Sequence, residues 1–395
     1  MVSNDAADAE VAKGPLHGLV VADFSRVLAG PYCTMLLADL GATVIKVEHP
    51  RGDETRAWRP PVREGTSTYY LSINRNKRSV VLDLEDLADR ELGKRLASRA
   101  DVLVENFKPY GLCRFGLDYE SVAATNPGIV YASITGFGTA GGAKLPGYDL
   151  LVQALSGLMS ITGAPDTPPF RSGVAVFDVI TGLHACSGIL AALYHRGSAG
   201  VGQHLELDLM TSALSGMVNQ TGGFLLSGMM PSRIGNDHPS IFPYAPFDTA
   251  DGQIVLAVGN DTQFRALCEL LSVPGLVEDP RFASNGDRSA HREELRPLLT
   301  ARLRERSAVE WFEIMRSAGI PAAPVADVAG GIAFAKELGL DPVIEMGVGA
   351  NKLPGIRHPI RFSRTPPAYP LMPPTLDQDG EAVRRWLEGQ TGFGV

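Results

Sequence analysis

The sequence predicts an α/β protein whose larger part is built on a mostly parallel sheet. Strand-like apolar runs occur in the first third at residues 18–24, 43–48, 79–84, 101–107 and 128–135. Between them, residues 31–42 and 84–100 carry apolar side chains at helical spacing. The first of these helices has Pro31 at its start and Gly41 just past its end, as helix termini prefer. Strand, helix and strand in this order predict parallel βαβ units.

A second, smaller α+β domain is expected further along the chain. Residues 244–259 read as a hairpin around Asp251-Gly252, a pair suited to a tight turn. Helical patterns follow at 261–271, 291–306 and 308–319. We therefore expect a tail, a large domain, a linker, a small α+β domain, and a final linker that returns to the large domain. Their predicted bounds are 1–14, 15–210, 211–234, 235–325 and 326–395.

Composition restricts the classes of function. The chain has 395 residues and a formal net charge of -8, which argues against nucleic acid or a membrane surface as a partner. The cysteines are far apart and form no CxxC pair, as expected for reduced thiols in a cytoplasmic protein. No run approaches the roughly 18 apolar residues of a membrane span.

Several common chemistries lack their motifs. The first strand leads into SRVLAGPY, without the GxGxxG of a dinucleotide site. The chain contains no GxxxxGK[ST], no GxSxG and no HExxH. We therefore expect no metal site and no permanently bound cofactor.

One carboxylate stands out, Asp178 in RSGVAVFDVITGL. Residues 174–177 read as a short buried strand, and a helical pattern follows at 183–193. An aspartate at such a junction is most often a helix N-cap, worth about 1 kcal/mol. It is also a place where an anion is stabilised by the helix dipole. The local sequence leaves both readings open.

Several motifs in order resemble the family III CoA-transferases. They include VLAGPYCTMLLADLGATVIKVEHPRGDETR, ADVLVENFKPYGLCRFGLDY, GYDLLVQALSGLMSITG and HPSIFPYAPFDTADGQIVLAVGNDTQF, and the likeness runs from about residue 15 to 370. The resemblance implies a Rossmann-like large domain, a smaller domain and an interlocked homodimer. It also implies acyl-CoA and a carboxylic acid as substrates.

By motif position, the resemblance makes Asp178 the catalytic nucleophile. Its carboxylate would attack the donor thioester, giving a mixed anhydride and then an aspartyl-CoA thioester, and the acceptor acid would reverse these steps. We expect backbone N–H groups at the start of its helix to stabilise the oxyanion.

The residues before and at Asp149 distinguish two branches of the family. The racemase branch has a histidine where this chain has Tyr148, and a tyrosine is a poor base for proton exchange at neutral pH. We therefore expect a transferase. A 2-methylacyl-CoA racemase and a non-catalytic CoA-binding homologue remain alternatives.

The resemblance also assigns a set of CoA contacts. They are Val27, Leu28, His49, Leu82, Asn106, Phe107, Arg114 and Tyr148. For Leu82 and Phe107 the alternative is sheet packing, and for Arg114 it is a solvated charge. Candidates on the acid-substrate side are Asp149, Arg26, Arg171 and His238.

Two departures bear on the substrate. Leu28 and His49 replace a glutamine and an arginine of the formyl-CoA transferase branch, and its glycine-quartet loop is missing. Formate and oxalate are therefore not expected. GYDLLVQALSGLMSITG and HPSIFPYAPF resemble the succinyl-CoA-dependent branch, which makes a dicarboxylate acceptor the expected one.

Overall fold

The computed structural model describes residues 14–350 and 352–390, so the predicted tail lies outside the described residues except for Gly14. The chain forms two compact units. Unit 1 takes in the described residues of Met1–Ser156, Ser172–Ser227 and Asp341–Val395, and unit 2 takes in Gly157–Arg171 and Gly228–Leu340.

Unit 1 is built on a parallel sheet, as the sequence predicted. Its strands are β1 (Val20–Asp23), β2 (Thr43–Glu48), β5 (Lys77–Val81), β6 (Val102–Glu105), β7 (Val130–Thr135) and β8 (Gln203–Asp208). Their order across the sheet is β5-β2-β1-β6-β7-β8, and every pair is parallel. Numbered within this sheet, the order is 3-2-1-4-5-6, the Rossmann arrangement. Ligands bind such sheets beyond the carboxyl ends of the strands, where the order reverses between β1 and β6.

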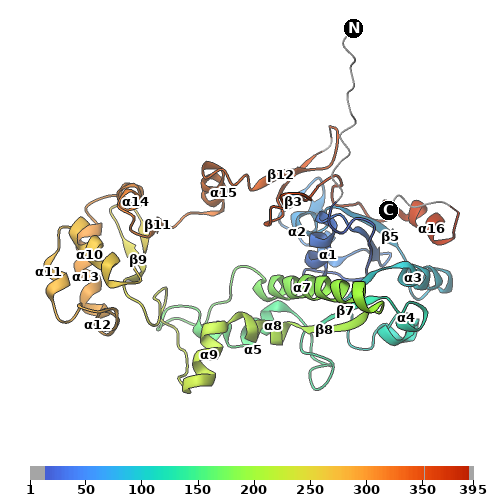
Figure 1. Cartoon of the computed structure of the whole chain (residues 1–395), viewed down its shortest axis with the longest axis horizontal. Coiled ribbons are helices and arrows are strands. Elements are labelled where there is room, and N and C mark those ends of the chain that lie inside the picture. Colours follow the sequence, from blue (N-terminus) through green and yellow to red (C-terminus); the bar gives the residue numbers. More distant parts are fainter. Residues whose placement is uncertain (1–13, 351, 391–395) are drawn as a thin grey trace, which may run out of the picture. The chain divides into compact units, whose positions relative to one another are not determined.

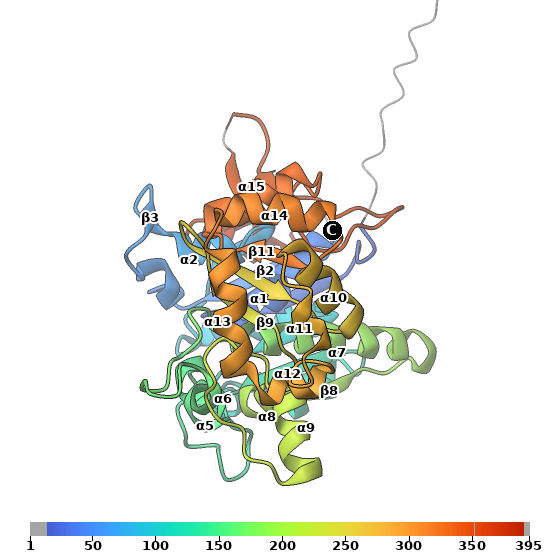
Figure 2. The same ribbon diagram turned by 90° about the vertical axis from the view of Figure 1, so that its left-hand side faces the viewer.

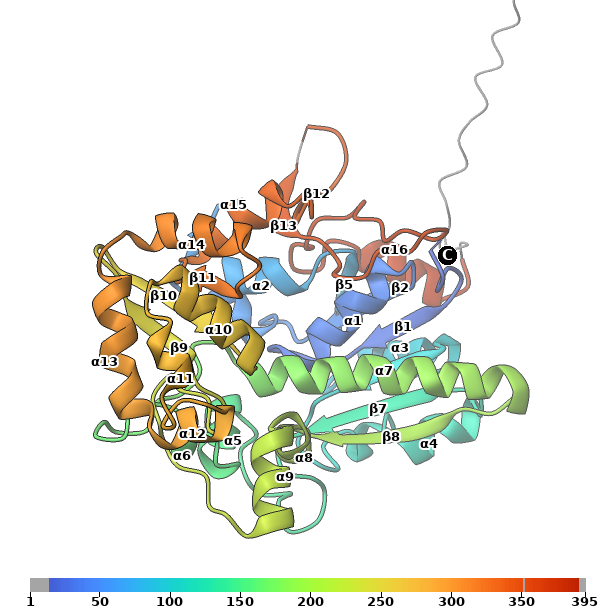
Figure 3. The same cartoon turned by 60° about the vertical axis from the view of Figure 1, so that its left-hand side comes forward.

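Helices cover both faces of this sheet (Figures 1 and 3). Helix α1 (Ala29–Asp39) packs against the long helix α7 (Val176–Ala199), which also contacts β7 and β8. On the opposite face, α3 (Leu87–Arg99), α4 (Tyr119–Thr125) and α16 (Gly380–Leu387) close a core that includes Leu96, Val122 and Leu387.

The remaining elements of unit 1 are short. They are η1 (Glu54–Ala57), β3 (Val62–Arg63), β4 (Thr66–Ser67), α2 (Thr68–Ile73), η2 (Cys113–Phe115), α5 (Asp149–Leu155), α8 (Leu209–Gly216), α9 (Val218–Ser227), β12 (Val343–Met346) and β13 (Leu353–Ile356). Helices α8 and α9 occupy most of the segment predicted as a linker.

One predicted strand is wrong. Residues 174–177 do not join the sheet, because α7 already begins at Val176 and Val174 is exposed. Only Phe177 of this run is buried. The apolar run thus serves a helix start, and the sixth strand of the sheet is β8.

A C-terminal strap, residues 366–379, follows the β5 edge of the sheet. Asn76 N–H donates to the Leu371 carbonyl at 3.0 Å, Asp379 N–H donates to the Ser79 carbonyl at 2.9 Å, and Ser79 N–H donates to the Asp379 carboxylate at 3.0 Å. The Asp377 carboxylate accepts from Val81 N–H at 2.7 Å. An open strand edge is thereby paired.

Unit 2 has its own core, around a three-stranded antiparallel sheet (Figure 2). The predicted hairpin is present as β9 (Tyr244–Asp248) and β10 (Gln253–Ala257). The other elements are α6 (Leu158–Ile161), α10 (Asp261–Leu270), α11 (Gly275–Glu278), α12 (Asn285–Ala290), α13 (Arg292–Leu303), α14 (Ala308–Ser317), β11 (Ala322–Pro324) and α15 (Val328–Glu337).

Helix α7 departs from the expectation that no segment has the length and apolarity of a membrane span. By length and composition alone it is long and apolar enough to cross a membrane. Core helices of soluble proteins pass the same test, and α7 buries Phe177, Ala185 and Ile189. A cytoplasmic location remains a prediction.

Candidate active site

Asp178 lies in the first turn of α7, two residues after the helix begins. The N-cap position belongs to Ala175, so the simple capping role considered for Asp178 does not apply. Its side chain is partly buried. Within the described residues no hydrogen bond or ion pair reaches its carboxylate, which leaves both oxygens available to a substrate.

Asp149 of α5 caps the start of α7 instead. One of its carboxylate oxygens accepts from the backbone N–H of Phe177 (2.8 Å) and of Asp178 (3.2 Å). Gln153, one turn further along α5, accepts from Ser172 N–H at 2.8 Å and donates to Asp149. Two side chains of α5 thus hold the segment that carries Asp178. The expectation that these α7 N–H groups receive an oxyanion is wrong for Phe177 and Asp178, because Asp149 occupies both.

The surroundings make Asp178 a weak acid. Burial of its carboxyl, and then the negative charge of Asp149, raise the pKa of Asp178 to about 7. Near neutral pH its protonated and ionised forms are therefore both populated. A group tuned this way at a functional site matches the pattern of catalytic carboxylates.

The start of α7 is pressed against α1. A Cβ at Gly182, one turn after Asp178, would lie 2.7 Å from the Ala29 carbonyl oxygen and 3.2 Å from the Tyr32 ring. Residues one turn apart share a helix face, so Asp178 faces the beginning of α1. Glycine is required at position 182 by this close approach.

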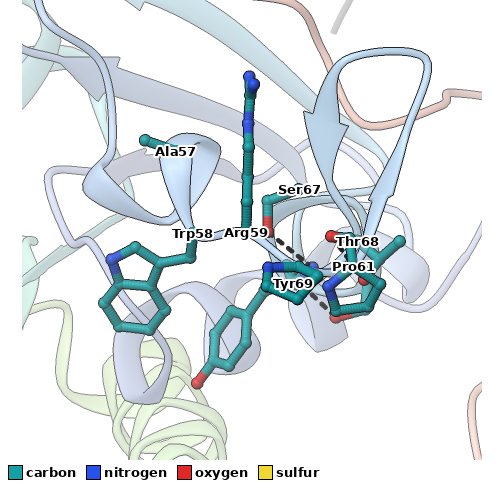
Figure 4. A pocket seen from close by; sticks show the side chains of 9 residues that line it. Ala57, Trp58, Arg59, Pro61, Ser67, Thr68 and Tyr69 are labelled. Carbon is teal, nitrogen blue, oxygen red and sulfur yellow. Dashed lines mark hydrogen bonds between the residues drawn. The ribbon is translucent and has the colours of Figure 1, made fainter.

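An aromatic pair that sequence reasoning missed adjoins this carboxylate. The rings of Trp58 and Tyr69 meet edge to face, with centroids 5.1 Å apart. Burial, and then the charges of Asp178 and Asp149, raise the pKa of Tyr69 to about 12, so its phenol stays neutral. In Figure 4 both rings project to one side and the Arg59 side chain to the other. No spacing in RAWRPPVREGTSTYYL marked these residues.

The aromatic pair lines a cavity of about 770 Å³. Its other lining residues are Ala57, Arg59, Pro60, Pro61, Ser67, Thr68 and Ser72. Arg59 donates to the Gly65 carbonyl at 2.7 Å, on the β3–β4 side. The part of the cavity beside Tyr69 is therefore aromatic and neutral, which suits an acyl chain.

A second cavity, of about 430 Å³, lies at the carboxyl ends of β1 and β2. Three predicted residues line it: Arg26, His49 and Phe107. Asn106 adjoins it, donating to the Arg26 carbonyl at 2.7 Å and accepting from Arg26 N–H at 3.0 Å. Val27 follows with a positive φ of 69°, which is unusual for a β-branched residue. Two of the predicted CoA contacts, His49 and Phe107, thus line one cavity together with Arg26, which was predicted on the acid-substrate side.

Other predicted contacts lie elsewhere. Leu82 is buried in the sheet core, as the packing alternative stated. Arg114 is exposed and pairs with Glu85 at 2.5 Å, as a solvated charge does. Leu28 is buried at the N-cap of α1, and Tyr148 is exposed just before Asp149.

Two candidates on the acid-substrate side belong to unit 2. Arg171 is exposed there. His238 packs edge to face on Tyr244, with ring centroids 5.3 Å apart, and its backbone N–H donates to the Tyr244 carbonyl. Within the described residues no group of three or more His, Cys, Asp or Glu side chains is placed to hold a metal ion.

The fold and these residues define a CoA-transferase of family III. The family model of CoA-transferase family III matches residues 16–380, so the chain belongs to this family and the predicted family is confirmed. Among relatives, a succinate–glutarate CoA-transferase of Agrobacterium fabrum is 42% identical over 95% of this chain and 96% of its own length. An acetyl-CoA:oxalate CoA-transferase of Acetobacter aceti is 38% identical over 94% of this chain and 96% of its own length.

A solved structure shows the same fold. A CAIB/BAIF family protein from Brucella suis superimposes with a TM-score of 0.86, at 41% identity, over 95% of this chain and 100% of that one.

Proposed function

We propose that this CoA-transferase moves CoA from succinyl-CoA, or another dicarboxyl-CoA, to a carboxylic acid through covalent intermediates on Asp178. The observation that carries the proposal is the Asp178 carboxylate itself. It is partly buried, unpaired within the described residues, and held at the start of α7 by Asp149. Such an arrangement costs stability and serves a nucleophile.

The steps balance without any further reagent. An Asp178 oxygen attacks the thioester carbon of the donor, and the carbon–sulfur bond breaks to give a mixed anhydride and CoA thiolate. The thiolate attacks the Asp178 carbonyl carbon and releases the donor acid, leaving an aspartyl-CoA thioester. The acceptor carboxylate attacks that thioester, and the freed thiolate then takes the acceptor acyl group and restores Asp178.

Each tetrahedral step needs a donor for its oxyanion. Asp149 occupies the Phe177 and Asp178 N–H groups, so α7 is a poor source. The start of α1 is the better one, because its N-cap, Leu28, makes no side-chain cap and Gly182 brings the two helices together. We assign the oxyanion to this end of α1.

The 430 Å³ cavity is the proposed place of the nucleotide part of CoA. Phe107 offers an aromatic face for adenine, Arg26 offers a cationic group for phosphate, and the His49 ring can donate a hydrogen bond to it. The Trp58–Tyr69 cavity is the proposed place of the acyl chain.

The names of two relatives bear on the acids exchanged. A 42% identical relative is named a succinate–glutarate CoA-transferase, which supports a dicarboxylate pair. A 38% identical relative is named for acetyl-CoA and oxalate, which keeps oxalate among the acids to test. Both acids belong in any substrate panel.

We also propose a homodimer. Helix α9 has no buried residue, and its Val218, Leu225 and Leu226 are 71%, 79% and 91% exposed. Tyr194 on α7 is 88% exposed. Apolar exposure like that of α9 marks a protein interface, and light scattering after gel filtration would give the mass. A monomer at micromolar concentration would reject the dimer.

The test of the function combines a substrate panel with one variant. The protein is incubated with succinyl-CoA and glutarate, oxalate or other acids, and acyl-CoA products are followed by mass spectrometry. We expect new acyl-CoA and a CoA adduct on Asp178 with the wild type, and neither with Asp178→Asn. Asp118→Asn is the control, because Asp118 caps α4 through Ser121 N–H at 3.2 Å.

The other readings give different results. Exchange of the α-proton of a 2-methylacyl-CoA in D₂O, without new acyl-CoA, would identify a racemase. CoA binding with neither reaction would identify a non-catalytic homologue. Transfer by Asp178→Asn at the wild-type rate would reject the nucleophile.

A further inference from the structure

The β1–α1 turn, residues 25–28, keeps an unfavourable conformation. Val27 has φ +69°, although its branched Cβ disfavours the left-handed region. Such a conformation persists only where the surroundings enforce it, and it is found preferentially at functional sites. The Asn106 side chain holds the turn at Arg26 through two exposed hydrogen bonds, of 2.7 Å to its carbonyl and 3.0 Å from its N–H.

Lys46 contacts the same turn from its buried side. Its side chain is fully buried in β2, and its ammonium donates to the Ser25 carbonyl at 3.0 Å and to the Asp53 carboxylate at 2.9 Å. The other oxygen of Asp53 accepts from Thr55 N–H at 3.0 Å and, more weakly, from Val27 N–H at 3.5 Å. One buried ion pair thus reaches the turn on both sides of Arg26.

A second buried ion pair supports the same residues. Lys77 donates to Asp23 at 3.0 Å, and Asp23 accepts from Ser25 N–H at 3.0 Å. Buried ion pairs add little to stability compared with apolar residues of the same volume. Their presence under one strained turn points to a geometric purpose.

We propose that Lys46 is a positioning residue, which holds the β1–α1 turn in the conformation that binds CoA. It acts through the turn, since its ammonium is bonded to Ser25 and Asp53 at the floor of the 430 Å³ cavity. The inference rests on the proposed placement of CoA in that cavity. Without these bonds from Lys46, the conformation of the turn that binds CoA is populated only in part, and the apparent affinity for CoA falls by that fraction.

The test measures the Kd of free CoA by calorimetry, which needs no turnover. Lys46→Met is expected to raise the Kd about tenfold, equal to ~1.4 kcal/mol. In the Val27→Gly background, Lys46→Met is expected to raise it less than about threefold, because glycine adopts positive φ without strain. This rescue distinguishes holding a strained turn from a general loss of structure.

Arg75→Met is the matched control. Arg75 and Asp39 form a similarly buried pair in unit 1, at 2.6 Å, at the C-terminal end of α1. Its loss is expected to lower the melting temperature and leave the Kd of CoA unchanged. If Lys46→Met does not fold, Asp53→Asn replaces it, since the amide keeps an acceptor for Thr55 but loses the charge that fixes Lys46.

Phe107→Ala tests the placement of CoA independently of the role of Lys46. If neither Phe107→Ala nor Lys46→Met changes the Kd, the placement of CoA is wrong. If Phe107→Ala changes the Kd but neither Lys46→Met nor Asp53→Asn does, the positioning role of Lys46 is wrong and the placement of CoA stands. If Lys46→Met raises the Kd equally in the wild type and in the Val27→Gly background, the positioning role of Lys46 is also wrong.

Discussion

Helices α1 and α7 pack against each other, yet their first turns are arranged in opposite ways. At α7 a carboxylate from another helix, Asp149, takes the first N–H groups and adds a negative charge beside Asp178. At α1 no side chain caps the start, and the turn before it is strained at Val27. In the proposed mechanism this difference assigns separate tasks, with α7 presenting Asp178 as the nucleophile and α1 leaving its N–H donors open for the oxyanion.

Removal of the α7 cap is the most disruptive test of this comparison. Asp149→Ala frees the Phe177 and Asp178 N–H groups and lets the segment move. We expect kcat to fall about 100-fold, the effect of misplacing a catalytic group by about 1 Å. Asp149→Asn, which keeps an acceptor, should retain most of the activity at pH 8. Equal losses in both variants would mean that the charge of Asp149, and not the cap, matters.

The pH profile sharpens the electrostatic side of the comparison. In the proposed mechanism only ionised Asp178 attacks, and its pKa in the free protein is about 7, so kcat/KM should rise about tenfold per pH unit well below pH 7 and level off above it. In Asp149→Asn the acidic limb should move to lower pH, because one negative neighbour is gone. A wild-type rate that is constant from pH 5 to 8 would contradict this.

The contact between the two helices is tested by one methyl group. Gly182→Ala would place Cβ 2.7 Å from the Ala29 carbonyl, and overpacking of this kind costs roughly 1–3 kcal/mol. We expect lower thermal stability together with reduced transfer. Gly188→Ala, on the same helix with its nearest contact at 3.5 Å, should be neutral or stabilising. Similar melting temperatures for both variants would place the helices further apart.

A further expected effect concerns stability and pH. Folding raises the pKa of Asp178 from 3.8 to about 7, so between those values the folded state binds more protons and stability falls as pH rises. Asp178→Asn removes this loss. Its melting temperature relative to wild type should therefore be higher at pH 8 than at pH 4, as differential scanning calorimetry would show.

Asp118→Asn should behave in the opposite sense. Burial, which would raise the pKa of Asp118, is outweighed by its hydrogen bonds to Ser121, which lower it. Its charged form therefore stabilises the fold at high pH and that contribution is lost as pH falls through the folded-state pKa. A shared sign for the two variants would contradict the assignment of buried charge to Asp178.

Sequence reasoning found the strands that are buried on both faces. The runs at β1, β2, β6 and β7 are dense in Val, Ile and Leu, which central parallel strands require. It missed β8, QHLELD, because this edge strand is only partly buried and polar residues surround its two leucines, Leu205 and Leu207. Periodicity could not tell the apolar start of α7 from a strand, since residues 174–177 are too few.

The site was predictable in part. Asp178, Asn106 and Phe107 follow from motifs, but the cap supplied by Asp149 spans 28–29 residues of sequence and no local pattern encodes it. Trp58 and Tyr69 come from a segment without regular periodicity. Lys46 alternates with apolar residues in β2 like a surface lysine, and only the fold reveals its burial.

The C-terminal strap ties the completion of the sheet to the order of synthesis. Strand β5 is made early, at residues 77–81, yet the segment that pairs with its free edge ends at residue 379. The whole of unit 2 is translated in between. On the ribosome, the β5 edge of the Rossmann sheet therefore stays open until residues 366–379 have emerged, and this nascent surface is the one that chaperones have most reason to shield.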